Sequence, residues 1–280
     1  MTKRVAVIND LSGFGKCSLT AAIAVLSAMG VQPCPMPTAV LTNQSGFPIY
    51  HSVDFTDNMD SYLDAWQKNN AEFNGIYSGY ITNDKQIDYI LRFINTFRRK
   101  DTVVIVDPVM ADNGVKYRAY NELMCLKMRD LAAKADFITP NLTEICILTD
   151  NSFDEVACLN GDALLKKISE MAMSLVQENN QIVIVTGVPD DNSMCNCIFS
   201  KETKAFVRNK LYKGSYSGTG DIFASVFCGG IINGMSAEKA VELAGCFLEK
   251  SLADTIVIPD RDRNHGVEFE KNLSMLLNLQ

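Results

Sequence analysis

A glycine-rich loop followed by an apolar run gives this sequence its clearest chemical signal. The loop, Ser-Gly-Thr-Gly-Asp, leads directly into the apolar stretch 222–232. Glycines let backbone amides turn inward, and the helix predicted to follow adds the positive end of its dipole. We therefore expect an anion hole at Gly218, Thr219 and Gly220.

Asp221 closes this loop at the expected start of the helix. As a mere cap it would be repelled by a bound phosphate, and Thr219 could cap the helix instead. A general base explains the carboxylate better, because it would accept a proton from a hydroxyl group as that oxygen attacks phosphorus. The alternative is a glycine turn with an acidic N-terminal cap.

Two other expected strand ends carry amide and carboxylate side chains. In Thr-Pro-Asn-Leu-Thr-Glu, Asn141 and Glu144 lie three residues apart on one side of a short helix. They could hold the water shell of Mg²⁺ beside nucleotide phosphates, although an ordinary capping motif explains the same residues. In Val-Asp-Pro-Val-Met-Ala-Asp, Asp107 leaves a strand directly and Asp112 follows, although acidic residues are also common in turns.

The loop Asp-Leu-Ser-Gly-Phe-Gly-Lys near the N-terminus looks at first like a phosphate loop. The P-loop pattern fails, because Cys17 follows Lys16 and Asp10 stands in place of the first glycine. The dinucleotide pattern fails as well, because Ser18 stands in place of its third glycine. The phosphates are therefore expected elsewhere, and this loop needs another role.

These loops must be positioned by the elements between them. Runs rich in Val and Ile predict strands at 5–9, 75–77, 102–106, 137–139 and 181–186. Apolar stripes predict helices at 19–29, 85–99, 163–178, 222–232 and 237–252. The strand runs do not alternate in polarity, which is typical of buried parallel strands. The prediction is a three-layer α/β/α fold with a doubly wound, mainly parallel sheet, and ligands at the carboxyl ends of its strands.

A hairpin at 195–199 and 205–208 is expected to add an antiparallel element late in this sheet. With no linker or repeat in view, the chain of 280 residues is interpreted as one domain.

The excess of acidic residues, 33 against 26 basic residues, argues against non-specific affinity for nucleic acid or anionic membranes. The nine cysteines lack metal spacing and are expected to be reduced. With neither a signal peptide nor a membrane-spanning run apparent, we expect a cytoplasmic protein.

Six stretches, in this order, resemble the ribokinase-like superfamily, and within its vitamin kinase branch the pyridoxal kinases: INDLSGFGKCSLTAAIAVLSAMGV, PMPTAVLTNQSG, SGYITN, VDPVMAD, TPNLTE and YSGTGD. The resemblance extends over nearly the whole chain. It implies a single ribokinase-like domain over residues 1–280 with small lid or flap loops. It also implies transfer of the ATP γ-phosphoryl group to the 5′-hydroxymethyl group of a B6 vitamer, with Mg²⁺ and K⁺, in a homodimer.

The resemblance further implies roles for individual residues. Asp221 matches the catalytic base, the three residues before it match the anion hole, and Asp107 and Glu144 match the Mg²⁺ cluster. The positions that match contacts to ATP and the monovalent cation are Asp112, Tyr117, Thr139, Asn141 and Thr186. The positions that match the acceptor side are Ser12, Gln44, Ser45 and Tyr80. Lys16 receives no role, and His51 and His265 fall outside the matching motifs, where surface or loop roles are expected.

Two alternatives stay open. Hydroxymethylpyrimidine kinases form a related branch, but they usually carry cysteine where this chain has Asp221. The family often has His-Thr-Gly where this chain has Gln44 and Ser45, so the contacts to the acceptor differ and Gln44 points a little toward that branch. A non-catalytic vitamer-binding protein is the other alternative, and it would not need the base.

Overall fold

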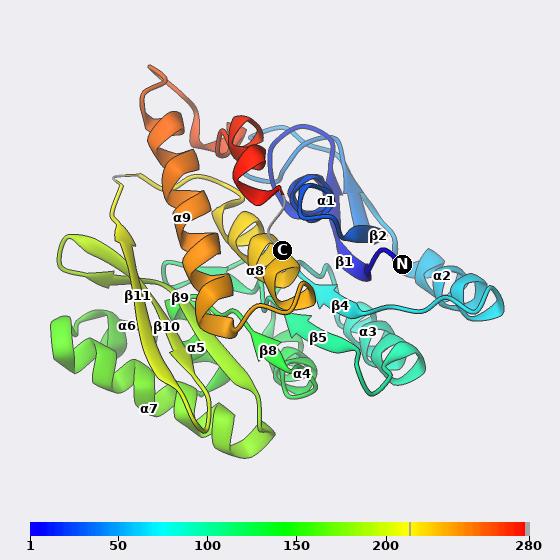
Figure 1. Ribbon diagram of the computed structural model, residues 1–280, viewed down its shortest axis with the longest axis horizontal. Coiled ribbons are helices and arrows are strands. Elements are labelled where there is room, and N and C mark those ends of the chain that lie inside the picture. Colours follow the sequence, from blue (N-terminus) through cyan, green and yellow to red (C-terminus); the bar gives the residue numbers. More distant parts are fainter. Residues whose placement is uncertain (213, 278–280) are drawn as a thin grey trace.

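A nine-stranded sheet runs through the middle of the computed structural model, which describes residues 1–212 and 214–277 (Figure 1). The strand order is β11-β10-β9-β8-β5-β4-β1-β2-β3. Neighbouring strands from β9 through β2 are parallel, whereas β3, β10 and β11 pair in antiparallel fashion. The strands are β1 Arg4–Ser12, β2 Gln32–Leu41, β3 Ser52–Asp54, β4 Gly75–Ser78, β5 Val103–Val106, β8 Phe137–Ile138, β9 Ile182–Asp190, β10 Ser193–Phe199 and β11 Lys204–Lys210.

Helices cover both faces of the sheet (Figure 1). Two hydrophobic cores lie between the sheet and these two layers of helices. One face carries α1 Ser18–Ala28, α8 Thr219–Ile232 and α9 Ala237–Ile256, with the 3₁₀ segments Arg263–His265 and Glu270–Leu276 beside them. The other face carries α2 Thr56–Lys68, α3 Asp84–Phe97, α4 Glu122–Ala132, α5 Leu142–Leu148, α6 Phe153–Ala157 and α7 Gly161–Asn179. Successive residues of β1 enter opposite cores, Val5 and Val7 on one side and Ala6 and Ile8 on the other, so this strand is apolar throughout.

The expected three-layer α/β/α fold with a mainly parallel sheet is confirmed. All five expected parallel strands and all five expected helices are present, with ends that shift by up to four residues, and the hairpin is β10–β11. The sequence did not predict β2, β3, α2, α4 and α6, nor the small sheet of β6 Ala111–Asp112 and β7 Val115–Lys116.

Prolines explain why β2 escaped prediction. Pro33, Pro35 and Pro37 interrupt the usual pattern of a strand. The amide of Gln32 donates to Lys3 O of the neighbouring chain segment at 2.9 Å, so alternate residues face β1 and the prolines face the open edge. A missing N–H costs no ladder hydrogen bond there.

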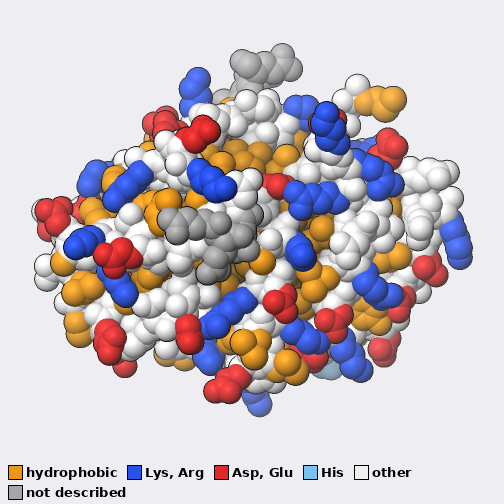
Figure 2. All heavy atoms as spheres, turned by 90° about the horizontal axis from the view of Figure 1, so that it is seen from below, with side chains coloured by type: hydrophobic (Ala, Val, Ile, Leu, Met, Phe, Trp, Pro, Cys, Tyr) orange, Lys and Arg blue, Asp and Glu red, His pale blue; other side chains and the backbone are white. Residues whose placement is uncertain are grey.

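The carboxyl ends of the parallel strands bring distant loops together. Gly79 N donates to Ile8 O, Asp107 N to Ser78 O, and Thr139 N to Val106 O, so the residues that leave these strands lie side by side. Basic and acidic side chains intermingle over the face that Figure 2 shows, with separate apolar side chains between them. None of the described helices has the length and apolar character needed to span a membrane.

Helix α8 carries the glycine loop at its N-terminus, so its packing in the core fixes the position of that loop. Phe227 of α8 is fully buried and meets the Phe137 ring edge-on at 5.5 Å between centroids. We expect Phe227→Ala to lower the free energy of unfolding by about 3–5 kcal/mol, measured by urea denaturation. Leu126→Ala on α4, where the side chain is 55% exposed, should change it by less than about 0.5 kcal/mol. Equal losses in the two variants would contradict this account of the core.

Candidate active site

One large cavity lies along the carboxyl ends of the parallel strands. Its volume of about 1620 Å³ exceeds the usual range for one small ligand, so there is room for two. Every residue that the sequence predicted for the site lines this cavity. These residues are Ser12, Gln44, Ser45, Tyr80, Asp107, Asp112, Tyr117, Thr139, Asn141, Glu144, Thr186, Gly218, Thr219, Gly220 and Asp221.

The glycine loop presents the N-terminus of α8 to the cavity. Gly218 is the N-cap residue, with a left-handed φ of 83°, and a Cβ there would lie 2.0 Å from Lys16 O. Only glycine fits such a position. No side chain caps the helix, so Thr219 does not have the capping role that the sequence allowed. The first amides of α8 therefore keep their capacity to bind an anion.

Asp221 lies in the first turn of α8 at the floor of the cavity, partly buried. Burial raises the pKa of its carboxyl to about 6, while hydrogen bonds from the Ser18 backbone and the Asn9 side chain oppose that rise. Asn9 Nδ2 donates to Asp221 Oδ1 at 3.3 Å, and Asn9 Oδ1 accepts from Tyr80 N at 2.8 Å. The carboxylate is thus oriented by the end of β1 and titrates within reach of neutral pH.

A pair of carboxylates, Asp107 and Glu144, lies nearby and is almost completely buried. Thr139 Oγ1 donates to Asp107 Oδ1 at 2.9 Å, yet burial, and then the charge of Asp221, raise the pKa of Asp107 to about 7. Burial also raises the pKa of Glu144, as does the charge of Asp107. Both groups would be stabilised as anions by a cation placed between them and a ligand.

The capping motif at α5 is present. Glu144 Oε2 accepts from Asn141 N at 2.9 Å, and Asn141 Oδ1 accepts from Glu144 N at 3.0 Å. Glu144 Oε1 also accepts from Met110 N at 3.0 Å, which ties the loop after β5 to α5. The capping interpretation is therefore correct for these contacts.

The carboxylates fit the requirements of Mg²⁺ only as part of its ligand set. Within residues 1–212 and 214–277, no three His, Cys, Asp or Glu side chains form a ready-made metal site. Asp107 and Glu144 are oxygen donors whose charges lack a basic hydrogen-bonding partner among the described contacts. Mg²⁺ keeps several waters and takes phosphate oxygens, so two carboxylates suit it.

The residues expected on the acceptor side line the cavity, and three of them make defined contacts. Ser12 is buried, and its Oγ donates to Asp10 Oδ2 at 2.9 Å. Tyr80 lies among the rings of Tyr117 and Tyr120, each 6.4 Å away between centroids. Gln44 lines the cavity but its amide is engaged, because Nε2 donates to Asn264 Oδ1 at 3.0 Å and Oε1 accepts from Gly46 N at 2.7 Å.

The residues expected at the nucleotide lie toward β9 and the small β6–β7 sheet. Asp112 belongs to β6, and Tyr117 N donates to Met110 O at 2.9 Å just after β7. Burial and nearby acidic groups raise the pKa of the Tyr117 hydroxyl well above its usual value. Thr186 N donates to Pro140 O at 2.9 Å, which joins β9 to the loop before α5.

Sequence reasoning missed three residues at the end of the first strand and beyond. Asn9 orients Asp221, and Asp10 is buried at the cavity wall, where burial raises its pKa. Cys17 is also buried there, and its thiol pKa is raised by burial and by Asp221. Two polar residues at the close of an apolar strand were the available signal for Asn9 and Asp10.

The three unassigned polar residues all lie in loops or short turns. Lys16 Nζ forms ion pairs with Glu268 and Glu270, so it does not face the cavity as a phosphate ligand. His265, in the short segment Arg263–His265, packs against Phe14, and His51 is exposed. The expected surface or loop roles of the two histidines agree with these places.

Comparison with known proteins assigns the family. The sequence model of the phosphomethylpyrimidine kinase family matches residues 14–265. The chain belongs to this family. A solved structure from Bacteroides thetaiotaomicron, described as a phosphomethylpyrimidine kinase in a crystal form with pyridoxal, is 35% identical. Its TM-score is 0.91, and the match covers 99% of this chain and 96% of that chain.

Other family relatives are named as pyridoxal kinases. The pyridoxine/pyridoxal/pyridoxamine kinase of Bordetella avium is 24% identical over 264 residues, 89% of this chain and 86% of that protein. The pyridoxal kinase of Leishmania donovani, solved with ADP and ginkgotoxin, has a TM-score of 0.84 at 22% identity and covers 98% of this chain and 95% of that chain, which shows a shared fold. The expected family and ribokinase-like fold are confirmed, and this chain is a phosphotransferase of the kinase type.

The raised pKa of Asp221 makes a prediction about stability. Its carboxyl titrates near 6 in the folded chain and near 3.8 when unperturbed, so ionisation opposes folding above pH 6 and this penalty disappears by about pH 4. We expect Asp221→Asn to raise the free energy of unfolding at pH 8 by about 1–3 kcal/mol and to change it much less at pH 4, measured by urea denaturation. Asp64→Asn, at an exposed position of α2, is the matched control. A destabilised Asp221→Asn protein at pH 8 would contradict the assignment.

Proposed function

We propose that this kinase transfers the γ-phosphoryl group of ATP to the 5′-hydroxymethyl group of a B6 vitamer: pyridoxal, pyridoxine or pyridoxamine. One observation carries the proposal. Asp221, with its raised pKa, lies in the first turn of a helix whose N-terminal amides open into a cavity large enough for two ligands. The solved relative in a form with pyridoxal and the relatives named as pyridoxal kinases support this choice of acceptor.

The chemistry follows from the positions of these groups. Asp221 accepts the proton of the acceptor hydroxyl as that oxygen attacks phosphorus, and Asn9 keeps the carboxylate aimed. The amides of Gly220 and its neighbours at the start of α8 stabilise the charge on the transferred group. Ser12 and Tyr80 hold the flat ring on the β1 side of the cavity. Phosphoryl transfer depends mainly on positioning and electrostatics, which these fixed groups provide.

The nucleotide is proposed to bind on the opposite side of the cavity. Asp112, Tyr117, Thr139, Asn141 and Thr186 would contact ATP there. Asp107 and Glu144 would hold Mg²⁺ through its waters, and the ion would neutralise charge on the β- and γ-phosphates. K⁺ near Thr139 and Thr186, a homodimer and a single domain spanning residues 1–280 are proposed from the resemblance, and a cytoplasmic location is proposed with them.

Hydroxymethylpyrimidine kinase is the second candidate, favoured by the name of the matching family. Its acceptor is also a flat ring with a hydroxymethyl group, so the general shape of the cavity suits both. The presence of Asp221 favours a B6 vitamer. The same carboxylate argues against a non-catalytic binding protein.

An assay of ADP release with four acceptors tests the function. We expect turnover with at least one of pyridoxal, pyridoxine and pyridoxamine at a higher kcat/KM than with hydroxymethylpyrimidine. Asp221→Ala should lower kcat by about 10²-fold or more while the affinity for ATP changes little, since a general base acts only in the chemical step. Preference for hydroxymethylpyrimidine would establish the second candidate. No turnover with any acceptor would favour the binding protein.

Asp107 offers a cleaner test of the metal role than Glu144, whose two oxygens accept backbone hydrogen bonds. We expect Asp107→Asn to raise the Mg²⁺ concentration for half-maximal rate by about 10-fold, because one anionic donor is lost. The measurement is a Mg²⁺ titration of initial rate at saturating ATP, with Asp64→Asn as the control. An unchanged Mg²⁺ requirement would remove Asp107 from the metal site.

A further inference from the structure

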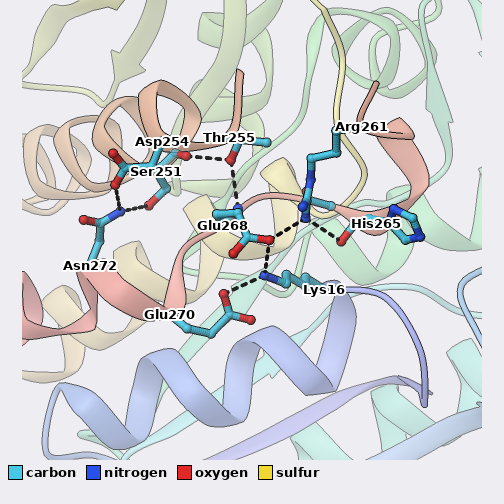
Figure 3. Close-up of polar contacts among 10 residues, drawn as sticks. Lys16, Ser251, Asp254, Thr255, Arg261, His265, Glu268, Glu270 and Asn272 are labelled. Atoms are coloured by element: carbon cyan, nitrogen blue, oxygen red, sulfur yellow. Dashed lines mark hydrogen bonds and ion pairs between the residues drawn. The ribbon is translucent and has the colours of Figure 1, made fainter. Parts of the chain in front are cut away.

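The chain after α9 returns to the active-site loops, and residues 261–270 are called here the C-terminal clamp. Figure 3 shows its ionic centre. Lys16 Nζ lies 2.9 Å from Glu268 Oε1 and 2.7 Å from Glu270 Oε2. Arg261 Nη2 approaches the same Glu268 oxygen at 2.7 Å. Glu268 thus joins a cation of the first loop to a cation at the start of the clamp.

The clamp is itself anchored to α9. Glu268 N donates to Thr255 Oγ1 at 2.8 Å, and Thr255 Oγ1 donates to Ser251 O at 2.7 Å (Figure 3). Asn272 Nδ2 donates to Asp254 Oδ2 at 3.0 Å just beyond the clamp. Because α9 packs on α8, the ionic centre is connected to the helix that carries Asp221.

Gly266 places the clamp between the first loop and the glycine loop. A Cβ on Gly266 would lie 3.0 Å from Lys16 Cβ and 3.1 Å from Ser217 O, and its φ is +74°. Ser217 N also donates to Arg263 O at 3.2 Å. Since Gly218 in turn abuts Lys16 O, the three segments are in mutual contact.

A fourth segment joins this contact from the acceptor side. Gln44 Nε2 donates to Asn264 Oδ1 at 3.0 Å and to Ser217 Oγ at 3.3 Å. The rings of Phe14, Phe47 and His265 lie 5.4–5.6 Å apart between centroids. Residues of the clamp therefore touch both acceptor-side loops and the loop of the anion hole.

We infer that Lys16, Arg261 and Glu268 are positioning residues, which hold the acceptor-side loops in register with the anion hole and Asp221. None of the three lines the cavity, so they act through the loops that do. Their side chains are only 12–23% exposed, and the charges alternate along the chain Arg261, Glu268, Lys16. Such a paired, shielded group resists solvent screening better than an exposed ion pair. For the reaction, this inference rests on the proposed function.

The kinetic test uses Glu268→Gln, which keeps the shape of the side chain and removes its charge. We expect kcat/KM for the acceptor to fall by about 5- to 30-fold, since small misplacement of reactants is costly, while KM for ATP changes less than about 2-fold. Lys16→Gln, which removes the opposite charge of the same ion pair, should likewise lower kcat/KM for the acceptor and leave KM for ATP nearly unchanged. Asp60→Asn, which breaks an exposed ion pair with Arg92, is the matched control and should change neither constant.

Hydrogen–deuterium exchange of the whole chain tests the clamp without any substrate. We expect the amides of residues 13–17 and 215–218 to exchange about 5-fold faster in Glu268→Gln than in the unaltered protein, and equally fast in Asp60→Asn. Unchanged exchange in both loops, or equal losses for acceptor and ATP with a general drop in Tm, would overturn the inference. If no B6 vitamer were turned over, the proposed function would fail, and exchange would still decide on the clamp.

Discussion

The close approach of Gly218 to the backbone of Lys16 constrains the whole functional edge of this molecule. It brings the start of α8 against the loop that leaves β1, although more than two hundred residues separate them in sequence. In the same region, Asn9 Nδ2 at the end of β1 donates to Asp221 Oδ1 in the first turn of α8. Other loops of the cavity leave the carboxyl ends of the parallel strands β4, β5, β8 and β9, which follow β1 across the sheet in that order.

The second constraint is the burial of several acidic side chains in one cavity. Asp10, Asp107, Glu144 and Asp221 line one cavity, and burial raises the pKa of each carboxyl. A fold selected for stability alone would not gather them. Their arrangement suits a site in which one ligand brings a cation and the other gives up a proton to a carboxylate. Proteins commonly retain such a local loss of stability where function requires it.

The sequence predicted well what depends on local pattern and on sheet topology. Apolar strand runs identified the parallel core, and polar residues at strand ends identified the cavity, because parallel strands end at one edge. Asn9 and Asp10 had the same signal and were overlooked. The link between Lys16 and Glu268 had no such signal, since an ion pair across 252 positions follows from the path of the chain after α9. The engaged amide of Gln44 was hidden for the same reason.

The prolines of β2 also limit aggregation through the edges of the sheet. An unpaired strand edge offers amide donors to any other extended chain, and Pro33, Pro35 and Pro37 withhold them along the open part of β2. The opposite edge, β11, carries Lys204, Arg208 and Lys210. Charge there repels a second identical strand. The open part of β2 and the edge strand β11 are thus protected by different means against pairing with strands of other molecules.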